Sequence, residues 1–300
     1  MQVSKGYKFS DVLMVPIPSR INSRDTPSLE TYGGYSLPFM ASPMHGIVGT
    51  RLIKQIALLG GIGFLHKFWR YSDDFFNALN KLKGVRYGMA VGTDLTYLEY
   101  AADAEMILVD VANGYTNKIL GVISTVKSSY PDKIIVAGNV VTKKGANLLT
   151  SAGADLVRVG IGNGSLCTTR AVIGIGYPQL SAISECSEVA NVIADGGMKT
   201  SGDMAKALAA GAVFCMLGGP LALAHESSHR GEIYGMASAR LHTEIGKEPK
   251  SIEGKVRKAK KTDYLRAILK QYSYGIKSSM TYLDAINLKE LRENVQWVEI

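Results

Sequence analysis

Ala209-Ala210-Gly211-Ala212-Val213-Phe214 ends a helical pattern at a glycine and begins an apolar strand immediately afterwards. The same unit recurs as Leu58-Leu59-Gly60-Gly61-Ile62-Gly63 and as Ser151-Ala152-Gly153-Ala154-Asp155-Leu156. Glycine at the end of a helix takes the left-handed conformation that lets the chain leave the helix. Helices that lead directly into strands predict an alternation of β and α elements, and such alternation produces a parallel sheet.

Eight short apolar runs of strand type follow this alternation along the chain. They cover Pro38–Ala41, Ile62–Leu65, Tyr87–Val91, Met106–Val109, Ile134–Ala137, Leu156–Val159, Val192–Ala194 and Val213–Leu217. Eight such units close most naturally into a barrel, so we expect an α/β protein whose residues 1–300 form one (β/α)8 TIM-barrel domain. Beyond the eighth strand, a loop-rich segment is expected at 227–261, followed by helices at Asp263–Tyr274 and Tyr282–Glu293.

Composition narrows the possible function classes. Three cysteines without clustered spacing argue against a disulfide framework or a structural zinc site and fit a reducing compartment. The first residues lack the apolar core of a signal peptide, so a cytoplasmic location is expected. The apolar run at 207–224 has about the length of a membrane span, but three glycines and Pro220 interrupt it. No membrane association is therefore expected.

The net charge of +8 raises the question of nucleic-acid binding. Seven basic residues lie together in Lys247–Lys261, against two acidic ones. A local cluster of this kind suits a small anionic ligand such as a nucleotide, and a solvated surface run is the alternative explanation. No nucleic-acid partner is expected.

Residues that directly follow the predicted strands are rich in polar side chains and glycine. In a (β/α)8 barrel these residues line the mouth at which active sites lie. They include Ser42 to His45, His66-Lys67, Gly92-Thr93, Asp110 to Asn113, Gly138-Asn139, Asp195-Gly196-Gly197 and Gly218-Gly219. The two Gly-Gly turns after the seventh and eighth strands occupy the positions where such barrels often hold a phosphate on backbone N–H groups.

Gly160-Ile161-Gly162-Asn163-Gly164-Ser165-Leu166-Cys167-Thr168-Thr169-Arg170 places a thiol at the end of a glycine-rich loop, beside two hydroxyls and a cation. This arrangement suits a nucleophilic sulfur. Cys186 in a helical pattern and Cys215 in a strand are interpreted as core residues. His225-Glu226-Ser227-Ser228-His229 matches the zinc-protease pattern H-E-x-x-H, but it lacks an evident third ligand, so the match is interpreted as accidental.

Together with Gly174-Ile175-Gly176-Tyr177-Pro178-Gln179-Leu180-Ser181-Ala182, the Cys167 loop closely resembles the catalytic loop of the IMP dehydrogenase and GMP reductase family. The similarity runs from Phe9-Ser10-Asp11-Val12-Leu13 through Ala137-Gly138-Asn139-Val140-Val141-Thr142 to the segment 275–282. The Tyr177 continuation, and the lack of the Arg-Tyr pair that dehydrogenases carry on their flap, resemble the reductase branch. The resemblance implies NADPH-dependent conversion of GMP to IMP and ammonia in a homotetramer. It also implies a mobile active-site flap within 227–261 and no inserted CBS domain.

The resemblance assigns residue roles by motif. Cys167 would attack C2 of the purine, while Thr169 and Glu253 would handle the proton that departing ammonia needs. Positions that match the nucleotide site are Ser165, Asp195, Gly196, Gly197, Gly218, Gly219, Gly235, Met236 and Gly254. Positions that match the cofactor site are Ser23, Arg24, Lys67, Asp110, Val111, Ala112, Ile161, Gly162, Met236, Lys250, Ser278, Ser279, Met280 and Thr281, of which 23–24 and 278–281 would reach the cofactor of a neighbouring subunit. The carbonyl oxygens of Gly162, Gly164 and Cys167 resemble a monovalent-cation site and imply K⁺.

Four positions depart from the family pattern, namely His45 for aspartate, Asn163 for proline, Ala237 for serine and Lys250 for arginine. Lysine lacks the bidentate fork with which arginine holds a phosphate, so NADH stays open beside NADPH. Deoxy-GMP or a related nucleotide stays open beside GMP. The alternative functions are an IMP dehydrogenase that lacks CBS domains and a purine-nucleotide-binding barrel without turnover.

Overall fold

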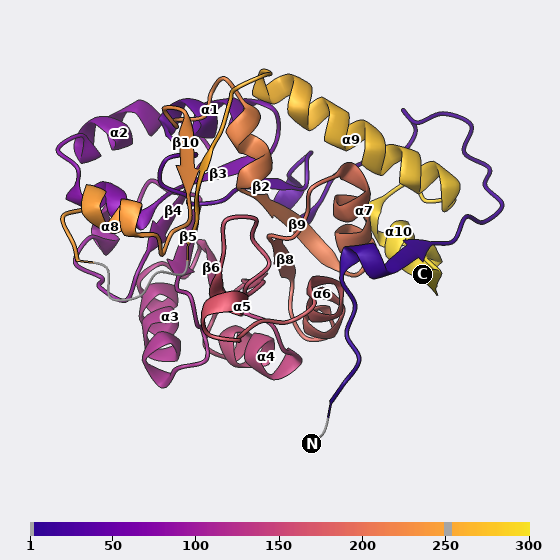
Figure 1. The fold of residues 1–300 in the computed structure, drawn as a ribbon, viewed down its shortest axis with the longest axis horizontal. Coiled ribbons are helices and arrows are strands. Elements are labelled where there is room, and N and C mark those ends of the chain that lie inside the picture. The colour runs from indigo at the N-terminus through magenta and orange to yellow at the C-terminus, as the bar shows by residue number, and fades with distance from the viewer. Residues whose placement is uncertain (1–2, 249–253) are drawn as a thin grey trace.

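The computed structural model describes residues 3–248 and 254–300, and its centre is a closed barrel of parallel strands (Figure 1). Each strand pairs with the next along the chain, and the last pairs with the first. The strands are β2 (Phe39–Ala41), β3 (Ile62–Leu65), β4 (Gly88–Val91), β5 (Met106–Asp110), β6 (Ile134–Val140), β7 (Leu156–Val159), β8 (Val192–Asp195) and β9 (Ala212–Leu217). The predicted (β/α)8 barrel is confirmed, and each predicted strand overlaps one observed strand.

Helices surround the barrel and cover the outer faces of its strands (Figure 1). They are α1 (Thr50–Leu58), α2 (Phe75–Leu82), α3 (Asn117–Ser129), α4 (Lys143–Ser151), α6 (Gln179–Ser187), α7 (Ser201–Ala209) and α9 (Leu265–Tyr282). The connection between β4 and β5 holds a 3-10 helix, Leu98–Ala101, instead of an α-helix. A one-turn helix, α5 (Thr169–Val172), lies in the loop after β7. Further 3-10 turns are Phe9–Asp11, Tyr32–Gly34, Lys67–Tyr71 and Gly219–Leu223. No helix in the described ranges combines the length and the apolar character needed to cross a bilayer.

Side chains alternate along the strands between two apolar layers, as the period of two requires. Met106 and Leu108 of β5 belong to the cluster that fills the barrel, whereas Ile107 and Val109 pack with the surrounding helices. The next inward position on β5 is Asp110. The layer nearest the carboxyl ends of the strands is therefore polar, and it adjoins the mouth of the barrel.

The glycines of the recurring helix-to-strand unit have the predicted left-handed conformation. Gly60, Gly153 and Gly211 have φ values of +91°, +109° and +114°. An L-residue with a side chain is strained in this region, so glycine is the residue that allows a strand to start directly after each helix.

The two chain termini pair at the side of the barrel, and Tyr35 lies at the amino ends of its strands. The strands β1 (Val12–Met14) and β12 (Trp297–Glu299) form a small antiparallel sheet, which pairs a segment near the N-terminus with the last residues of the chain. Tyr35 is fully buried and donates a hydrogen bond to Glu105 at 2.7 Å, while Arg86 lies over its ring. These residues lie away from the carboxyl ends of the strands, so they stabilise the barrel without entering its mouth.

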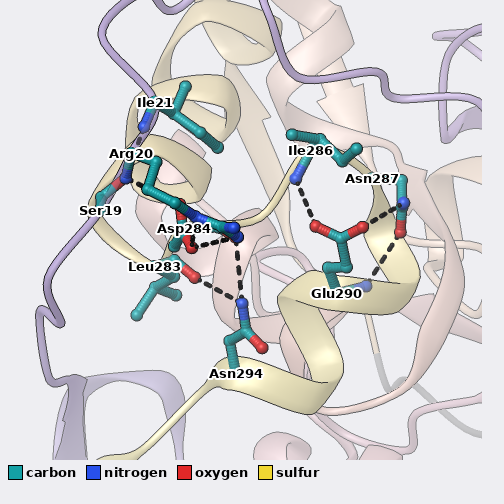
Figure 2. Close-up of polar contacts among 9 residues, drawn as sticks. All are labelled: Ser19, Arg20, Ile21, Leu283, Asp284, Ile286, Asn287, Glu290 and Asn294. Atoms are coloured by element: carbon teal, nitrogen blue, oxygen red, sulfur yellow. Dashed lines mark hydrogen bonds and ion pairs between the residues drawn. The ribbon is translucent and has the colours of Figure 1, made fainter.

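The predicted helix boundaries after the barrel are wrong in two ways. Helix α9 continues to Tyr282, and the expected helix Tyr282–Glu293 is broken before α10 (Leu288–Asn294). Asp284 interrupts it with φ +47°, and its carboxylate holds the Arg20 guanidinium of the N-terminal arm (Figure 2). Asn287 then starts α10, because its side chain accepts a hydrogen bond from the Glu290 N–H at 2.9 Å. The helical periodicity alone did not reveal this Asn-x-x-Glu capping signal.

The segment expected to be rich in loops contains regular structure. Strand β10 (Glu232–Tyr234) pairs antiparallel with β11 (Val256–Lys258), and α8 (Ala239–Glu244) lies between them in sequence. Both strands are three residues long and more than twenty positions apart, so neither carries a local strand pattern. Their pairing depends on the tertiary structure. We use the name flap for the described residues 232–248 and 254–258.

Candidate active site

The Cys167 thiol lies in the loop between β7 and α5, at the mouth of the barrel. Its Sγ is 3.0 Å from Oγ1 of Thr169, the first residue of α5. The Cys167 side chain is partly exposed, and its N–H donates to the Gly164 carbonyl at 3.0 Å. A hydroxyl at this distance can hydrogen-bond to a thiolate or pass a proton beside it. The loop therefore presents a partly exposed thiol with an adjacent hydroxyl group.

The other two thiols have a different environment. Cys186 in α6 and Cys215 in β9 are fully buried, as the sequence predicted. Burial raises the pKa of the Cys186 thiol to about 12 and raises that of Cys215 further. Both thiols are therefore protonated at neutral pH and suited only to packing.

Three turns at the carboxyl ends of neighbouring strands meet around the Cys167 loop. A Cβ atom on Gly196, after β8, would lie 3.1 Å from the Gly164 nitrogen. A Cβ atom on Gly219, after β9, would lie 2.8 Å from Oγ of Ser165. The predicted nucleotide residues of these three loops are thus in contact distance of one another. Their closeness leaves backbone N–H groups at one edge of the barrel, the position expected for a phosphate.

The flap covers the Cys167 loop. Gly254 forms an antiparallel bridge with Cys167, and the Lys255 N–H donates to the Leu166 carbonyl at 2.9 Å. A Cβ atom on Gly235 would lie 2.9 Å from Cα of Gly254 and 3.0 Å from the Leu166 carbonyl oxygen, so this close approach requires glycine. The predicted nucleotide residues Gly235 and Gly254 are therefore next to the Cys167 loop, and Met236 directly follows Gly235 in sequence. Glu253 and Lys250 lie outside the described residues.

A buried ion network connects the ends of β5, β7 and β8. Arg158 is 8% exposed and contacts Asp110 (Nη1 to Oδ1, 2.6 Å) and Asp195 (Nε to Oδ2, 2.9 Å). Lys67 lies 3.0 Å from the other Asp110 oxygen, and Asn139 donates to Asp195 Oδ2 at 2.8 Å. Burial by itself raises the pKa of Asp110, but the charges of Lys67 and Arg158 outweigh it, so this pKa is lowered. The network keeps the Asp110 carboxylate ionised, and it fixes the direction of both carboxylates.

This network joins the two halves of the predicted site. Asp195 belongs to the nucleotide set, whereas Lys67 and Asp110 belong to the cofactor set. Sequence reasoning did not assign a role to Arg158 or Asn139. The available signal for Arg158 was its charge within the otherwise apolar strand Leu156-Val157-Arg158-Val159, at an inward position.

The remaining predicted cofactor residues fall into two groups. The first group lies at the barrel mouth, in the loops after β5 and β7 and in the flap, and consists of Val111, Ala112, Ile161, Gly162 and Met236. The second group lies elsewhere: Ser23 and Arg24 are exposed in the N-terminal arm, and 278–281 belong to α9. Ser278 and Ser279 line a cavity of about 400 Å³ together with Met14 and Pro16. No hydrogen bond or ion pair within the described ranges joins this second group to Cys167, so its assignment to a neighbouring subunit stays a prediction.

The structure is consistent with the accidental nature of the H-E-x-x-H match. His225 to His229 do not lie on a helix. The Glu226 carboxylate accepts the Leu265 N–H at 2.9 Å, and His229 uses both ring nitrogens, one toward the Ala222 carbonyl and one toward the Gly231 N–H. Among the described residues, no three His, Cys, Asp or Glu side chains are grouped to hold a metal ion.

Comparison with known proteins agrees with this geometry. Residues 6–300 match the family profile described as the IMP dehydrogenase / GMP reductase domain. A GMP reductase from Buchnera aphidicola subsp. Schizaphis graminum is 34% identical, and the match covers 100% of this chain and 96% of that protein. GMP reductases from Vibrio campbellii and Enterobacter sp. are also 34% identical, with 100% of this chain and 97% of each relative covered. A profile match over nearly the full length, together with these relatives, shows that the chain belongs to the IMP dehydrogenase / GMP reductase family.

Proposed function

We propose that the protein converts GMP to IMP and ammonia, with a nicotinamide cofactor as the reductant. The observation that carries this proposal is the Cys167 thiol, 3.0 Å from the Thr169 hydroxyl and paired through its backbone with Gly254 of the flap. A nucleophile with its own proton donor under a covering segment suits covalent chemistry on a purine. The relatives named GMP reductase support the same substrate.

In the first step, the Cys167 thiolate adds to C2 of GMP. The bond from C2 to the exocyclic nitrogen then breaks, and a thioimidate between Cys167 and C2 is left. The amino group leaves poorly as an anion and well as ammonia, so this step needs a proton on the nitrogen. We assign that proton transfer to Thr169 together with Glu253, whose sequence neighbour Gly254 pairs with Cys167.

NADPH, when bound, would supply the hydride that C2 needs. Breaking of the C2–S bond would then return the electron pair to the Cys167 sulfur. The Cys167 thiolate would thereby be regenerated, and IMP would leave the site. Lys67 and Asp110 present a fixed cation and carboxylate at the cofactor side of the mouth, and Arg158 holds Asp110 in place. Val111, Ala112, Ile161, Gly162 and Met236 complete this side of the proposed cofactor site.

The nucleotide would lie between the strand-end turns and the flap. Asp195 can accept hydrogen bonds from the ribose hydroxyls, because its carboxylate is fixed by Arg158 and Asn139. Backbone N–H groups near Ser165 and in the turns after β8 and β9 would hold the phosphate. The carbonyls of Gly162, Gly164 and Cys167 would contribute to a K⁺ site, since neutral carbonyl oxygens are ligands that K⁺ accepts. Assembly as a homotetramer, with residues 23–24 and 278–281 reaching a neighbour's cofactor, belongs to the same proposal.

The direction of the reaction is tested by following nicotinamide absorbance in two mixtures, GMP with NADPH and IMP with NAD⁺. We expect oxidation of NADPH with GMP and release of ammonia. Faster oxidation of IMP to XMP would assign the protein to the dehydrogenase branch instead. Binding of GMP without turnover in either mixture would indicate a nucleotide-binding barrel.

The two chemical steps are separated by variants. Glu253→Gln should slow deamination of GMP by roughly 10²–10⁴-fold, the usual effect of losing a positioned acid or base. The reverse hydride transfer from IMP to oxidised cofactor needs the Cys167 thiolate but no ammonia proton, so it should persist in Glu253→Gln and vanish in Cys167→Ala. Cys186→Ala is the matched control, because it removes a buried thiol and should retain both steps. Turnover by Cys167→Ala would refute the covalent mechanism.

A further inference from the structure

Three polar side chains from separate parts of the chain meet where the flap packs against the barrel. His45 follows β2 at the barrel mouth, Tyr234 is the last residue of β10, and Glu244 is the last residue of α8. Nδ1 of His45 lies 2.6 Å from the Tyr234 hydroxyl, which lies 2.5 Å from Oε2 of Glu244. The same Glu244 oxygen is 3.3 Å from Nδ1 of His45. The barrel is thus linked to two elements of the flap through one hydroxyl group.

The hydrogen-bond directions in this cluster follow from the number of available protons. A phenol has one proton to donate, and the Glu244 carboxylate can only accept it. The Tyr234 oxygen must then accept from His45, so Nδ1 of His45 carries a proton. Burial raises the pKa of Tyr234, which keeps the phenol protonated. His45 therefore has to be a donor for the cluster to form.

The barrel also provides a fitted surface for the tyrosine ring. Tyr234 is 5% exposed, and a Cβ atom on Gly46 would lie 2.9 Å from Cζ of the ring. Gly46 also has φ +79°, a conformation that glycine adopts without strain. The turn after β2 thus contributes both a hydrogen-bond donor and the space for the phenol, and these are independent features directed at the same side chain.

The carboxylate that faces His45, that of Glu244, already has a cationic partner. Glu244 is paired with Arg240 at 2.8 Å on the same helix. The other titratable groups facing His45 are the Tyr234 phenol and the ring of His66, whose centre is 4.9 Å from that of His45. An anion in place of His45 would face Glu244 at about the separation of a hydrogen bond, without a proton to share.

We propose that His45, Tyr234 and Glu244 form a latch that holds the flap on the barrel, and that His45 is a positioning residue for nucleotide binding. Tyr234 directly precedes Gly235 and Met236 in sequence, and the Gly235 N–H donates to the Lys255 carbonyl at 3.1 Å. Fixing Tyr234 therefore fixes the strand pair that brings Gly254 to Cys167. The role in nucleotide binding depends on the proposed function, whereas the latch itself does not.

The test compares two substitutions of nearly identical shape. In His45→Asn, the amide nitrogen can take the place of Nδ1 and donate to Tyr234. In His45→Asp, an acceptor with negative charge occupies the same place. Tyr234→Phe keeps the ring but removes the shared hydroxyl. His225→Asp is the matched control, because it makes the same change at a histidine outside the cluster.

The first readout is hydrogen–deuterium exchange of peptides covering 232–244, with a peptide covering β6 as a measure of global folding. We expect faster exchange of the flap peptides by about tenfold to a hundredfold in His45→Asp and Tyr234→Phe, the range for losing a buried hydrogen bond. Exchange in His45→Asn and in His225→Asp should stay near that of the unmodified protein. If His45→Asp does not fold, Tyr234→Phe decides the result.

The second readout is the KM for GMP against kcat. Loss of the latch should raise KM by about tenfold or more while kcat changes much less, because the latch acts on binding and does not touch the reacting atoms. Equal flap exchange in all variants would refute the latch, and equal loosening in His45→Asn and His45→Asp would refute the donor role of His45. Loosened flap exchange without an effect on KM would refute the positioning role. Failure of the unmodified protein to reduce GMP would count against the proposed function alone, since the exchange experiment does not use turnover.

Discussion

Arg158→Met should lower the free energy of unfolding by about 3–5 kcal/mol at pH 7, the usual cost of removing one partner from a buried ion pair. Arg158 connects the carboxylates of Asp110 and Asp195, at 2.6 Å and 2.9 Å. Methionine keeps much of the length and the apolar packing but carries no charge. After the substitution, Asp110 keeps Lys67 as its partner, and within the described part of the chain the side chain of Asp195 keeps the neutral amide of Asn139.

The expected shift in melting temperature follows from the size of the protein. Unfolding entropy is about 2.1 cal/mol/K per residue, so a chain of 300 residues should lose roughly 5–8 °C for this change in free energy. The pH dependence has a definite sign. The pKa of Asp110 lies below its usual 3.8, so its ionised form stabilises the protein above that pH, and the stabilisation is lost as the pH falls through the folded pKa. In Arg158→Met, Asp110 loses one of the two cations that lower its pKa and takes up a proton more readily, so the difference from the unmodified protein should shrink as the pH falls toward 4.

Thermal and urea unfolding at pH 7 and near pH 4.5 measure this effect. Arg158→Lys is the control, because it keeps one positive charge but cannot contact both carboxylates with a fork of fixed geometry. Its loss should be smaller, about 1–2 kcal/mol. An Arg158→Met variant that unfolds at the temperature of the unmodified protein would refute the structural role of the network. A deficit that is the same at both pH values would show that lost packing, and not uncompensated charge, causes the destabilisation.

Three further predictions concern other parts of the molecule. Iodoacetamide should label Cys167 in the folded protein but not Cys186 or Cys215, and peptide mass spectrometry that finds equal labelling of all three would contradict their different burial. Gly121→Ala in α3 should raise the free energy of unfolding by about 0.5–1 kcal/mol, because alanine favours the helix and its methyl group would have no atom within 4 Å to clash with. A lower free energy of unfolding in urea would contradict this prediction. Burial, together with the neighbouring His45, lowers the pKa of His66 well below 6.5. The neutral His66 side chain therefore stabilises the fold above pH 6.5, and this stabilisation is lost as the pH falls. The free energy of unfolding should decline less between pH 6.5 and 5 in His66→Phe than in the unmodified protein, and parallel curves of this free energy against pH would contradict the prediction.

Local sequence patterns were sufficient to predict the barrel, and they single out the Cys167 loop as the candidate catalytic loop. The alternation of helix, glycine and strand depends on residues that are neighbours in sequence, such as Gly153 and Leu156, so each unit carries its own signal. Cys167 could be proposed as a nucleophile because its glycine and hydroxyl neighbours lie within the same loop. The polar strand ends also predict which face would carry the site, since all strands of a parallel barrel end at one mouth.

Where a helix ends could be determined only in part. A helix was expected to begin at Tyr282, but helix α9 ends at this residue. Asp284 interrupts the helical pattern, because it has a left-handed conformation and binds Arg20 from the other end of the chain (Figure 2). Helical periodicity records which face of a segment is apolar, and it does not record a contact across more than 260 positions of sequence.

The sequence by itself determined the order of the elements, the candidate nucleophile Cys167 and the mouth at which this thiol lies, because these depend on short-range patterns. Only the tertiary structure decided that Arg158 bridges Asp110 and Asp195, and that His45 meets Tyr234 and Glu244. Such contacts depend on how closure of the barrel aligns separate strands, and on how the flap packs against the turn after β2. Residues far apart in sequence come together through that packing, and no pattern within a single segment specifies the partner.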